Sequence, residues 1–230
     1  FAVAAAATAA ELWQQDGDDT RLVRALVTLS RQQWLTERTA AARASAERAY
    51  ELACPLGDSY QNALATLNLG GLLVVIDREA DGLPHLDEAL GIAERCGAAS
   101  VAALCRNYRG SALLQLGDLR GCEDLLASMA QAAELDNHEY VMRAYYNLIE
   151  GLWRLGEYRH ALGYIEQAEN FGRDRDFRVH GYMFAARRCR LTLMRGQWAE
   201  AEAGLRDLLE GQDDPGMIGR ETVPVLARVL

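Results

Sequence analysis

A pattern of small and apolar residues returns along the chain at intervals of about 40 residues, and this repeat constrains the fold more than any other feature. It is clearest in LWRLGEYRHALGYIEQA, which begins at Leu152. Related segments begin at Leu191 (LTLMRGQWAEAEAGLRDLL) and at Ala112 (ALLQLGDLRGCEDLLASMA). A motif that returns at this spacing indicates stacked copies of one supersecondary unit, each of which buries its apolar faces against its neighbours.

Each copy is predicted to be two helices joined by a tight turn. In the copy around Leu152, the apolar residues Ala144, Leu148 and Leu152 fall on one stripe at helical spacing. Gly156 follows that stripe and suits the left-handed position that ends a helix. Small residues are expected where helices approach each other closely, as at Ala161 and Ala168, the latter against the next unit. The same alignment assigns Cys122, Leu126 and Met129 to these inward positions in the copy around Gly117.

The first two copies match the pattern less well. Glu37 and Asp77 stand where the turn glycine is expected, so longer turns are predicted there. The fold class is nevertheless all-α. One repeat domain is predicted over 1–230, with a partial unit at 1–17, full units at 20–57, 60–97, 100–137, 140–177 and 180–213, and a partial unit at 219–230. The first residue is Phe1 and the last segment resembles a helix cut short, so a fragment of a larger protein is expected.

Composition excludes several function classes. The formal net charge is −9 and all 24 basic residues are arginine, so a P-loop lysine is impossible and direct contact with nucleic acid is not expected. Apolar runs are too short to span a bilayer, and a cytoplasmic location is expected. The four histidines are scattered, without metal-ligand spacing. No nucleophile–base set is evident, so we expect no enzyme activity, no cofactor and no metal.

The segments NLIEGLWRLGEYRHALGYIEQA (147–168) and RLTLMRGQWAEAEAGLRDLL (190–209) resemble the tetratricopeptide repeat (TPR) family in their order of Leu, small residue, Gly, aromatic residue and two alanines. The resemblance implies a right-handed superhelical solenoid of antiparallel helix pairs. The period alone would also allow an armadillo- or HEAT-type array, but the Gly-aromatic-x-x-Ala motif favours the TPR type.

In the TPR family the first helix of each unit lines a concave groove, and the resemblance therefore implies the binding residues here. Arginine forks pair with carboxylate or phosphate, and adjacent aromatic rings can hold an apolar or planar group. Alternatively, these arginines bridge to glutamates on adjacent helices, and the two tryptophans pack in the core. The fourth unit is the strongest candidate. The groove positions are Arg24, Arg31, Trp34, Leu67, Val74, Asn107, Ser111, Gln115, Arg143, Tyr146, Glu150, Trp153, Arg154, Ala186, Arg190 and Met194.

Units of this period are similar to the TPR-like arms of large bacterial LuxR-type or MalT-like ATP-dependent transcriptional regulators. That resemblance implies a non-catalytic sensor or interaction arm that binds a protein, a peptide or a small-molecule inducer in its groove, with self-association possible. The alternative is a free-standing TPR adaptor that binds peptides of partner proteins in its groove.

Overall fold

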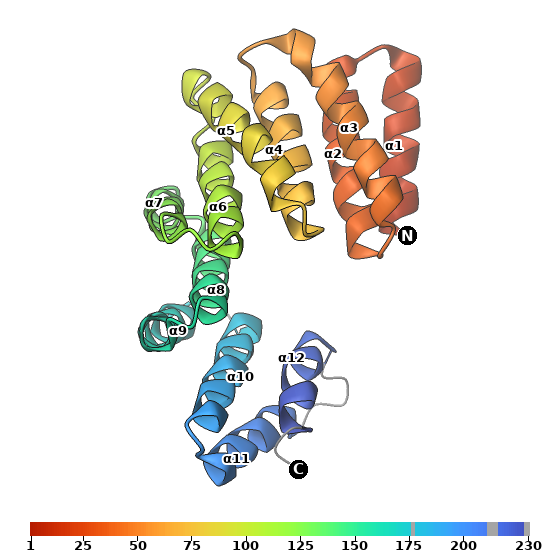
Figure 1. Cartoon of the computed structure of the whole chain (residues 1–230). Coiled ribbons are helices and arrows are strands. Elements are labelled where there is room, and N and C mark those ends of the chain that lie inside the picture. The colour runs from red at the N-terminus through yellow and green to blue at the C-terminus, as the bar shows by residue number, and fades with distance from the viewer. Residues whose placement is uncertain (176–177, 211–215, 228–230) are drawn as a thin grey trace. The chain divides into compact units, whose positions relative to one another are not determined.

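The computed structural model describes residues 1–175, 178–210 and 216–227, and every regular element within these ranges is a helix (Figure 1). The predicted all-α fold of TPR-like helix pairs is confirmed. A single 3₁₀ turn, η1 (Cys54–Leu56), accompanies the α-helices. The α-helices are α1 (Ala2–Asp16), α2 (Asp19–Leu35), α3 (Thr39–Ala53), α4 (Tyr60–Val75), α5 (Glu79–Arg95), α6 (Ala99–Gln115), α7 (Gly121–Glu134), α8 (His138–Arg154), α9 (Tyr158–Arg173), α10 (Arg178–Met194), α11 (Trp198–Leu209) and α12 (Gly216–Leu226).

The helices gather into two compact units, Phe1–Val141 and Met142–Leu230. In the first unit α2 packs on α3, α4 on α5 and α6 on α7, and α4 also contacts both α2 and α6. Its core is built from leucine and alanine, with Leu26, Leu86 and Leu125 almost fully buried. In the second unit α10 packs against α9, α11 and α12, around the buried side chains of Leu148 and Phe184.

The turns between paired helices share one hydrogen-bonding pattern, including the two that were predicted to be longer. The amide of Arg38 donates to the carbonyl of Gln33 at 2.8 Å, and the amide of Asp118 donates to that of Leu113 at 2.8 Å. This five-residue span closes a helix end around one left-handed residue. The prediction of longer turns at Glu37 and Asp77 was wrong, because both residues adopt the left-handed conformation themselves, with φ of 62° and 60°.

A left-handed residue recurs at half the repeat length, since it ends the second helix of a unit as well as the first. The left-handed conformation makes most of these helices end at equivalent points. Gly57, with φ of 59° and ψ of −141°, is the exception, because there the chain leaves α3 through η1. The positions with positive φ among the described residues are Gly17, Glu37, Gly57, Asp77, Gly97, Gly117, Asp136, Gly156 and Gly196.

The third unit departs from the predicted register. Its second helix, α7, buries Gly121, Leu125 and Ser128, whereas Leu126 is 40% exposed and Cys122 is only half-buried. The inward positions therefore lie one residue earlier than the alignment with Ala161 predicted. The left-handed residues Gly117 and Asp136 are 19 positions apart, one fewer than the usual interval, which identifies a one-residue deletion as the cause.

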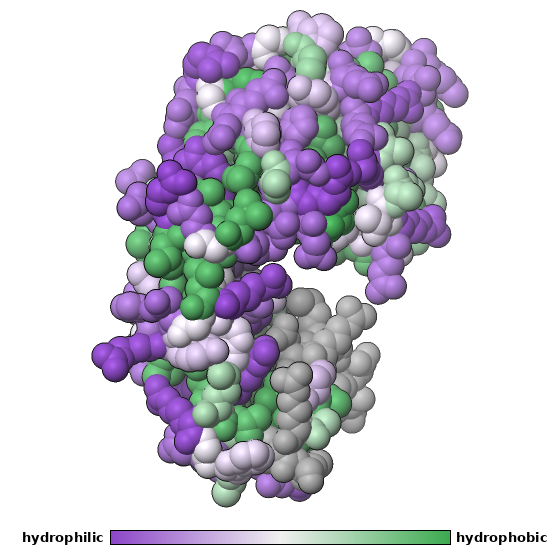
Figure 2. All heavy atoms as spheres, in the orientation of Figure 1, coloured by the Kyte–Doolittle hydropathy of each residue, from purple (hydrophilic) through white to green (hydrophobic). Residues whose placement is uncertain are grey.

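On the visible face of the first unit, hydrophilic residues cover most of the surface, and apolar residues show between them (Figure 2). Within the ranges that the structure describes, no helix combines the length and the apolar character required to cross a membrane.

Candidate functional site

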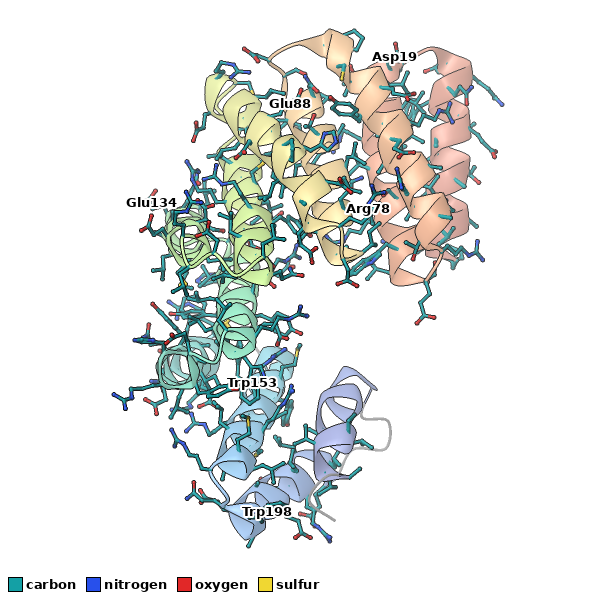
Figure 3. The ribbon with its side chains drawn as sticks, viewed as in Figure 1. Asp19, Arg78, Glu88, Glu134, Trp153 and Trp198 are labelled. Carbon is teal, nitrogen blue, oxygen red and sulfur yellow. The ribbon has the colours of Figure 1, made fainter. Side chains whose placement is uncertain are left out.

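Helices α8 and α10 bring together arginine, aromatic and glutamate side chains in the second unit. We call this set the α8–α10 cluster; it consists of Tyr146, Glu150, Trp153, Arg154, Arg187 and Arg190. Trp153 lies near the end of α8, close to the turn that leads into α9 (Figure 3). Tyr146, Glu150 and Trp153 of α8 are three, four or seven residues apart, and Arg154 lies four residues after Glu150, so they lie along one side of the helix.

Arg187, which is buried, and Glu150, which is partly exposed, form the inner part of the cluster. The side chain of Arg187 is only 6% exposed, and its Nη1 donates to Oε2 of Glu150. The guanidinium also lies over the ring of Tyr146, with 4.3 Å from its carbon to the ring centroid. On the outer side, Nε of Arg154 donates to Oε1 of Glu150 at 3.3 Å. One carboxylate thus accepts from two guanidinium groups on two helices.

The ionisation of Glu150 follows from these neighbours. Burial alone would raise the pKa of Glu150, but Coulombic attraction to Arg187 and hydrogen bonds from Arg187 and Arg154 outweigh it and lower the pKa below its ordinary value. Glu150 is therefore a carboxylate at neutral pH. Its charge offsets that of the buried Arg187, which would otherwise lie desolvated without an anion.

Arg190 is arranged differently. Its guanidinium lies over the ring of Trp153, 4.6 Å from the centroid, and the Trp153 ring meets Tyr158 edge-on at 5.2 Å between centroids. Within the described part of the chain, no carboxylate forms an ion pair with Arg190. A guanidinium stacked on an aromatic face keeps its N–H edge available for an anion.

The structure places eight of the predicted groove residues on α8 and α10, of which Ala186 is in the core and Met194 is exposed at the end of α10. Tyr146, Glu150, Trp153, Arg154 and Arg190 lie in the α8–α10 cluster, and Arg143 is half-buried nearer the start of α8. The suggested alternative has arginines bridging to glutamates on adjacent helices. The ion pair of Arg154 instead lies within α8, with Glu150 four residues before it, and the bridge between helices is made by Arg187.

In the first unit the predicted positions divide by burial. Arg24, Arg31 and Trp34 are exposed on α2, and Ser111 is half-buried on α6, where its hydroxyl accepts from Nε2 of Gln115 at 3.1 Å. Asn107 is only 1% exposed, so it does not line an accessible surface.

The groove prediction was also wrong for three further residues, which are buried in the core: Leu67, Val74 and Ala186. The reason is visible at α4, which contacts α2, α5 and α6. Because α4 is enclosed by other helices, its residues Leu67 and Val74 are buried. The equivalent residues of α8, Tyr146 and Trp153, remain partly exposed.

Arg187 is the functional-site residue that the sequence interpretation missed. It lies three residues before Arg190, so it shares a helix face with it, and that spacing was a usable signal.

The side chains of the α8–α10 cluster are of the types that recognise a ligand. Among the described residues, no three His, Cys, Asp or Glu side chains are grouped so that they could hold a metal ion. The α8–α10 cluster instead offers flat aromatic surface and guanidinium donors, which recognise carboxylate, phosphate and planar groups.

No protein-family model matches the chain, and no curated protein matches it. Solved structures do. A Rap protein in complex with competence and sporulation factor is similar with a TM-score of 0.67 and 16% identity, over 92% of this chain and 66% of that one. The TPR-like repeats of a putative kinesin light chain from Podospora anserina give a TM-score of 0.66 and 14% identity, over 90% and 98%.

A third similar structure is a signal transduction ATPase with numerous domains (STAND) from Pyrococcus horikoshii, which has a tetratricopeptide repeat sensor. Its TM-score is 0.62 with 16% identity, over 92% of this chain and 33% of that one. The chain therefore spans about two thirds of the Rap protein and one third of the STAND protein. At these identities the similarity establishes the TPR-like helical-repeat fold alone.

Proposed function

We propose that this chain is a non-catalytic binding scaffold that holds a peptide or an acidic small molecule on the α8–α10 cluster. The observation that carries this proposal is Arg190, stacked on Trp153 with no ion pair among the described residues. An incoming carboxylate or phosphate could pair with its N–H edge, while the ring of Trp153 packs against an adjacent apolar or planar group.

Glu150 and Arg187 serve as the support of this site. Their ion pair joins α8 to α10, and Arg154 is held beside it through the same carboxylate. Such a support fixes the position of side chains that would otherwise lose rotamer freedom on binding, and this lowers the entropic cost of the complex. In the first unit, the exposed Arg31 and Trp34 on α2 provide a smaller set of the same residue types.

We further propose that the chain is the sensor or interaction arm of a bacterial transcriptional regulator of the LuxR or MalT type. The similarity to a STAND protein with a repeat sensor supports this role, as does the similarity to a Rap protein bound to competence and sporulation factor. The second candidate is a free-standing adaptor. The kinesin light chain repeats favour it, because this fold accounts for 98% of that solved chain. The sequence that flanks this segment in its gene distinguishes the two.

Selection of a random peptide library on the 230-residue chain tests the binding role. We expect selected peptides to be rich in Asp or Glu next to an apolar residue. By fluorescence polarisation, Arg190→Ala should weaken the best peptide about tenfold, because a charge-assisted hydrogen bond contributes about 1.5–3 kcal/mol when it is well shielded from water. Arg206→Ala is the matched control, since Arg206 pairs with Glu202 on α11. Equal affinity in all three proteins would contradict the assignment.

A further inference from the structure

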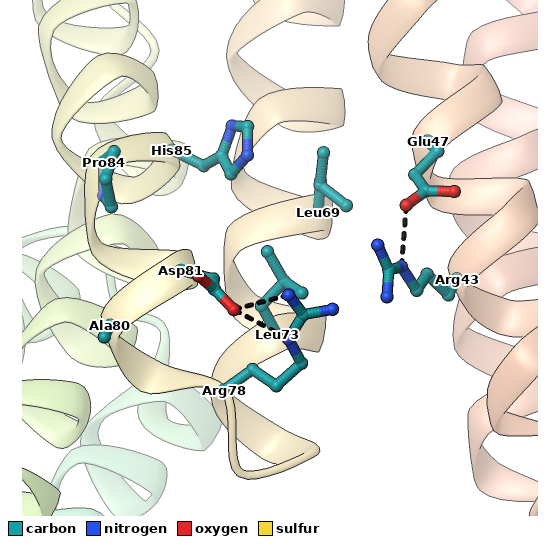
Figure 4. A pocket seen from close by; sticks show the side chains of 9 residues that line it. All are labelled: Arg43, Glu47, Leu69, Leu73, Arg78, Ala80, Asp81, Pro84 and His85. Carbon is teal, nitrogen blue, oxygen red and sulfur yellow. Dashed lines mark hydrogen bonds and ion pairs between the residues drawn. The ribbon is translucent and has the colours of Figure 1, made fainter.

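A cleft of about 340 Å³ opens between the second helices α3 and α5 of the first unit (Figure 4). Its lining comes from three helices: α3, α4 and α5. It shares no residue with the α8–α10 cluster. Among the described helix pairs, α3 packs on α2 and α4, while α5 packs on α4 and α6, so the first helix α4 forms the bottom of the cleft.

The bottom of the cleft is apolar and one end is closed. Leu69 and Leu73 of α4 form the floor, and each is 5% exposed. At the closed end, the ring of Tyr50 on α3 meets His85 on α5 edge-on, with 5.2 Å between centroids. The hydroxyl of Tyr50 also donates to Glu88 at 3.3 Å. A cleft that ends in this way accommodates a short molecule better than a continuous partner helix.

Two arginines stand at the other end, on opposite walls. Nε of Arg43 donates to Glu47 at 2.7 Å on α3, and Nε of Arg78 donates to Asp81 at 2.7 Å on α5. Both guanidinium groups reach into the space between the two helices (Figure 4). Within the described residues, both Nη atoms of Arg43 and Nη1 of Arg78 have no hydrogen-bond partner.

The backbone adds to this positive end. Helices α3 and α5 begin at Thr39 and Glu79, close to the two arginines, and neither N-cap residue makes a side-chain capping bond. The first turn of a helix carries partial positive charge, which favours an anion. Glu47 and Asp81 bring the formal charge of the walls to zero, and each lies beside its arginine on the same wall of the cleft (Figure 4).

We propose that the α3–α5 cleft binds a small amphipathic carboxylate. The headgroup accepts hydrogen bonds from Arg43 and Arg78, and the apolar part lies on Leu69 and Leu73 towards Tyr50. The volume of about 340 Å³ lies in the range of small-ligand pockets, which begins at about 300 Å³. The Nη groups that Glu47 and Asp81 leave without a partner can donate to a carboxylate, and charge-assisted hydrogen bonds of this kind favour an anion over a neutral ligand.

Octanoate is the probe, titrated into the 230-residue chain and followed by methyl NMR of Leu69 and Leu73. We expect saturable shifts of these methyl groups. Acetate, which lacks the tail, and octanol, which lacks the charge, should each bind at least about tenfold more weakly. Octyl phosphate separates the headgroups: tighter binding than octanoate would overturn the choice of a carboxylate, and octanol binding as well as octanoate would overturn the role of charge.

Variants of the lining complete the test. The double change Arg43→Gln and Arg78→Gln should weaken octanoate about tenfold, because two partly exposed charged hydrogen bonds are lost. Arg95→Gln is the matched control, since Arg95 pairs with Asp58 and does not line the cleft. Ala80→Trp, at an exposed lining position, should fill the cleft and remove binding while the helical circular dichroism is retained. No octanoate binding to the natural chain, or equal binding to the double variant and the control, would refute the site.

Discussion

Gly110 and Gly121 meet backbone to backbone where α6 crosses α7. A Cβ built on Gly110 would lie 2.6 Å from the carbonyl oxygen of Gly121 and 2.8 Å from Cγ of Leu125. Real Cβ atoms do not approach a carbonyl oxygen this closely, so only glycine permits this separation of the two helices. Gly70 and Gly82 repeat the relationship in the preceding pair, where a Cβ on Gly82 would lie 2.7 Å from the carbonyl oxygen of Gly70.

Gly110→Ala should therefore destabilise the chain, although alanine is the better helix former. The new methyl group forces α6 and α7 apart, and overpacking of this kind costs about 1–3 kcal/mol. Gly163→Ala on α9 is the matched control, because a Cβ there meets nothing within 4 Å. That change should stabilise by about 0.5–1 kcal/mol through helix propensity. Urea denaturation measures both, and a stabilising Gly110→Ala would contradict the close crossing.

The residues with left-handed backbone conformation allow the reverse test, in which a residue with a side chain is replaced by glycine. Glu37 and Asp77 carry side chains at φ of 62° and 60°, a conformation that costs a residue with a Cβ about 1–2 kcal/mol. Glu37→Gly and Asp77→Gly should each stabilise the chain by about 1 kcal/mol, since glycine removes this cost. Gly117→Ala, at φ of 88°, should destabilise by a similar amount. Melting temperatures that fall in both glycine variants would refute the shared turn geometry.

The repeat period was sufficient to predict helix pairs, and it located the glycine turns at Gly156 and Gly196 correctly. It failed at Glu37 and Asp77, because the left-handed conformation is favoured by glycine but not restricted to it. It also failed in α7, where two adjacent leucines, Leu125 and Leu126, make a shift of one residue invisible in the composition of the segment.

The candidate site was predictable in part for a related reason. Residues three, four and seven apart share a helix face whatever surrounds them, so Tyr146, Glu150, Trp153 and Arg154 could be grouped from their spacing alone. Burial depends on neighbours that lie far away in the sequence. Asn107 and Leu67 occupy positions equivalent to Tyr146, yet both are in the core because their helices are enclosed by others.

The ion pair between the buried Arg187 and the partly exposed Glu150 predicts how stability depends on pH. Removing Glu150 leaves Arg187 desolvated and without its carboxylate, so Glu150→Ala should destabilise by about 2–3 kcal/mol at pH 7. Arg206→Ala, which breaks an exposed pair with Glu202, should cost less than about 1 kcal/mol.

The pKa of Glu150 is lower in the folded protein than its ordinary value of 4.5, so the folded state favours the carboxylate. The contribution of Glu150 to the free energy of unfolding is complete at pH values above its ordinary pKa. It disappears as the pH falls through the lowered pKa of the folded state. Unfolding curves of the natural chain and of Glu150→Ala should therefore converge in acid. A difference that is independent of pH would show that packing, not charge, causes the loss.

The one-residue shift in α7 can be tested with two neighbouring leucines. Leu125 is fully buried against α6, and Leu126 is 40% exposed. Because truncation of a buried leucine removes apolar contacts and leaves a cavity, Leu125→Ala should cost about 2–5 kcal/mol in the free energy of unfolding. Leu126→Ala removes the same atoms from the surface and should change the free energy of unfolding by about 0.5 kcal/mol or less. The register predicted from the repeat alignment requires the reverse order, so urea denaturation of the two variants decides between the registers. Ser128 supports the observed one, since its buried hydroxyl donates to the carbonyl oxygen of Ala103 on α6 at 2.8 Å.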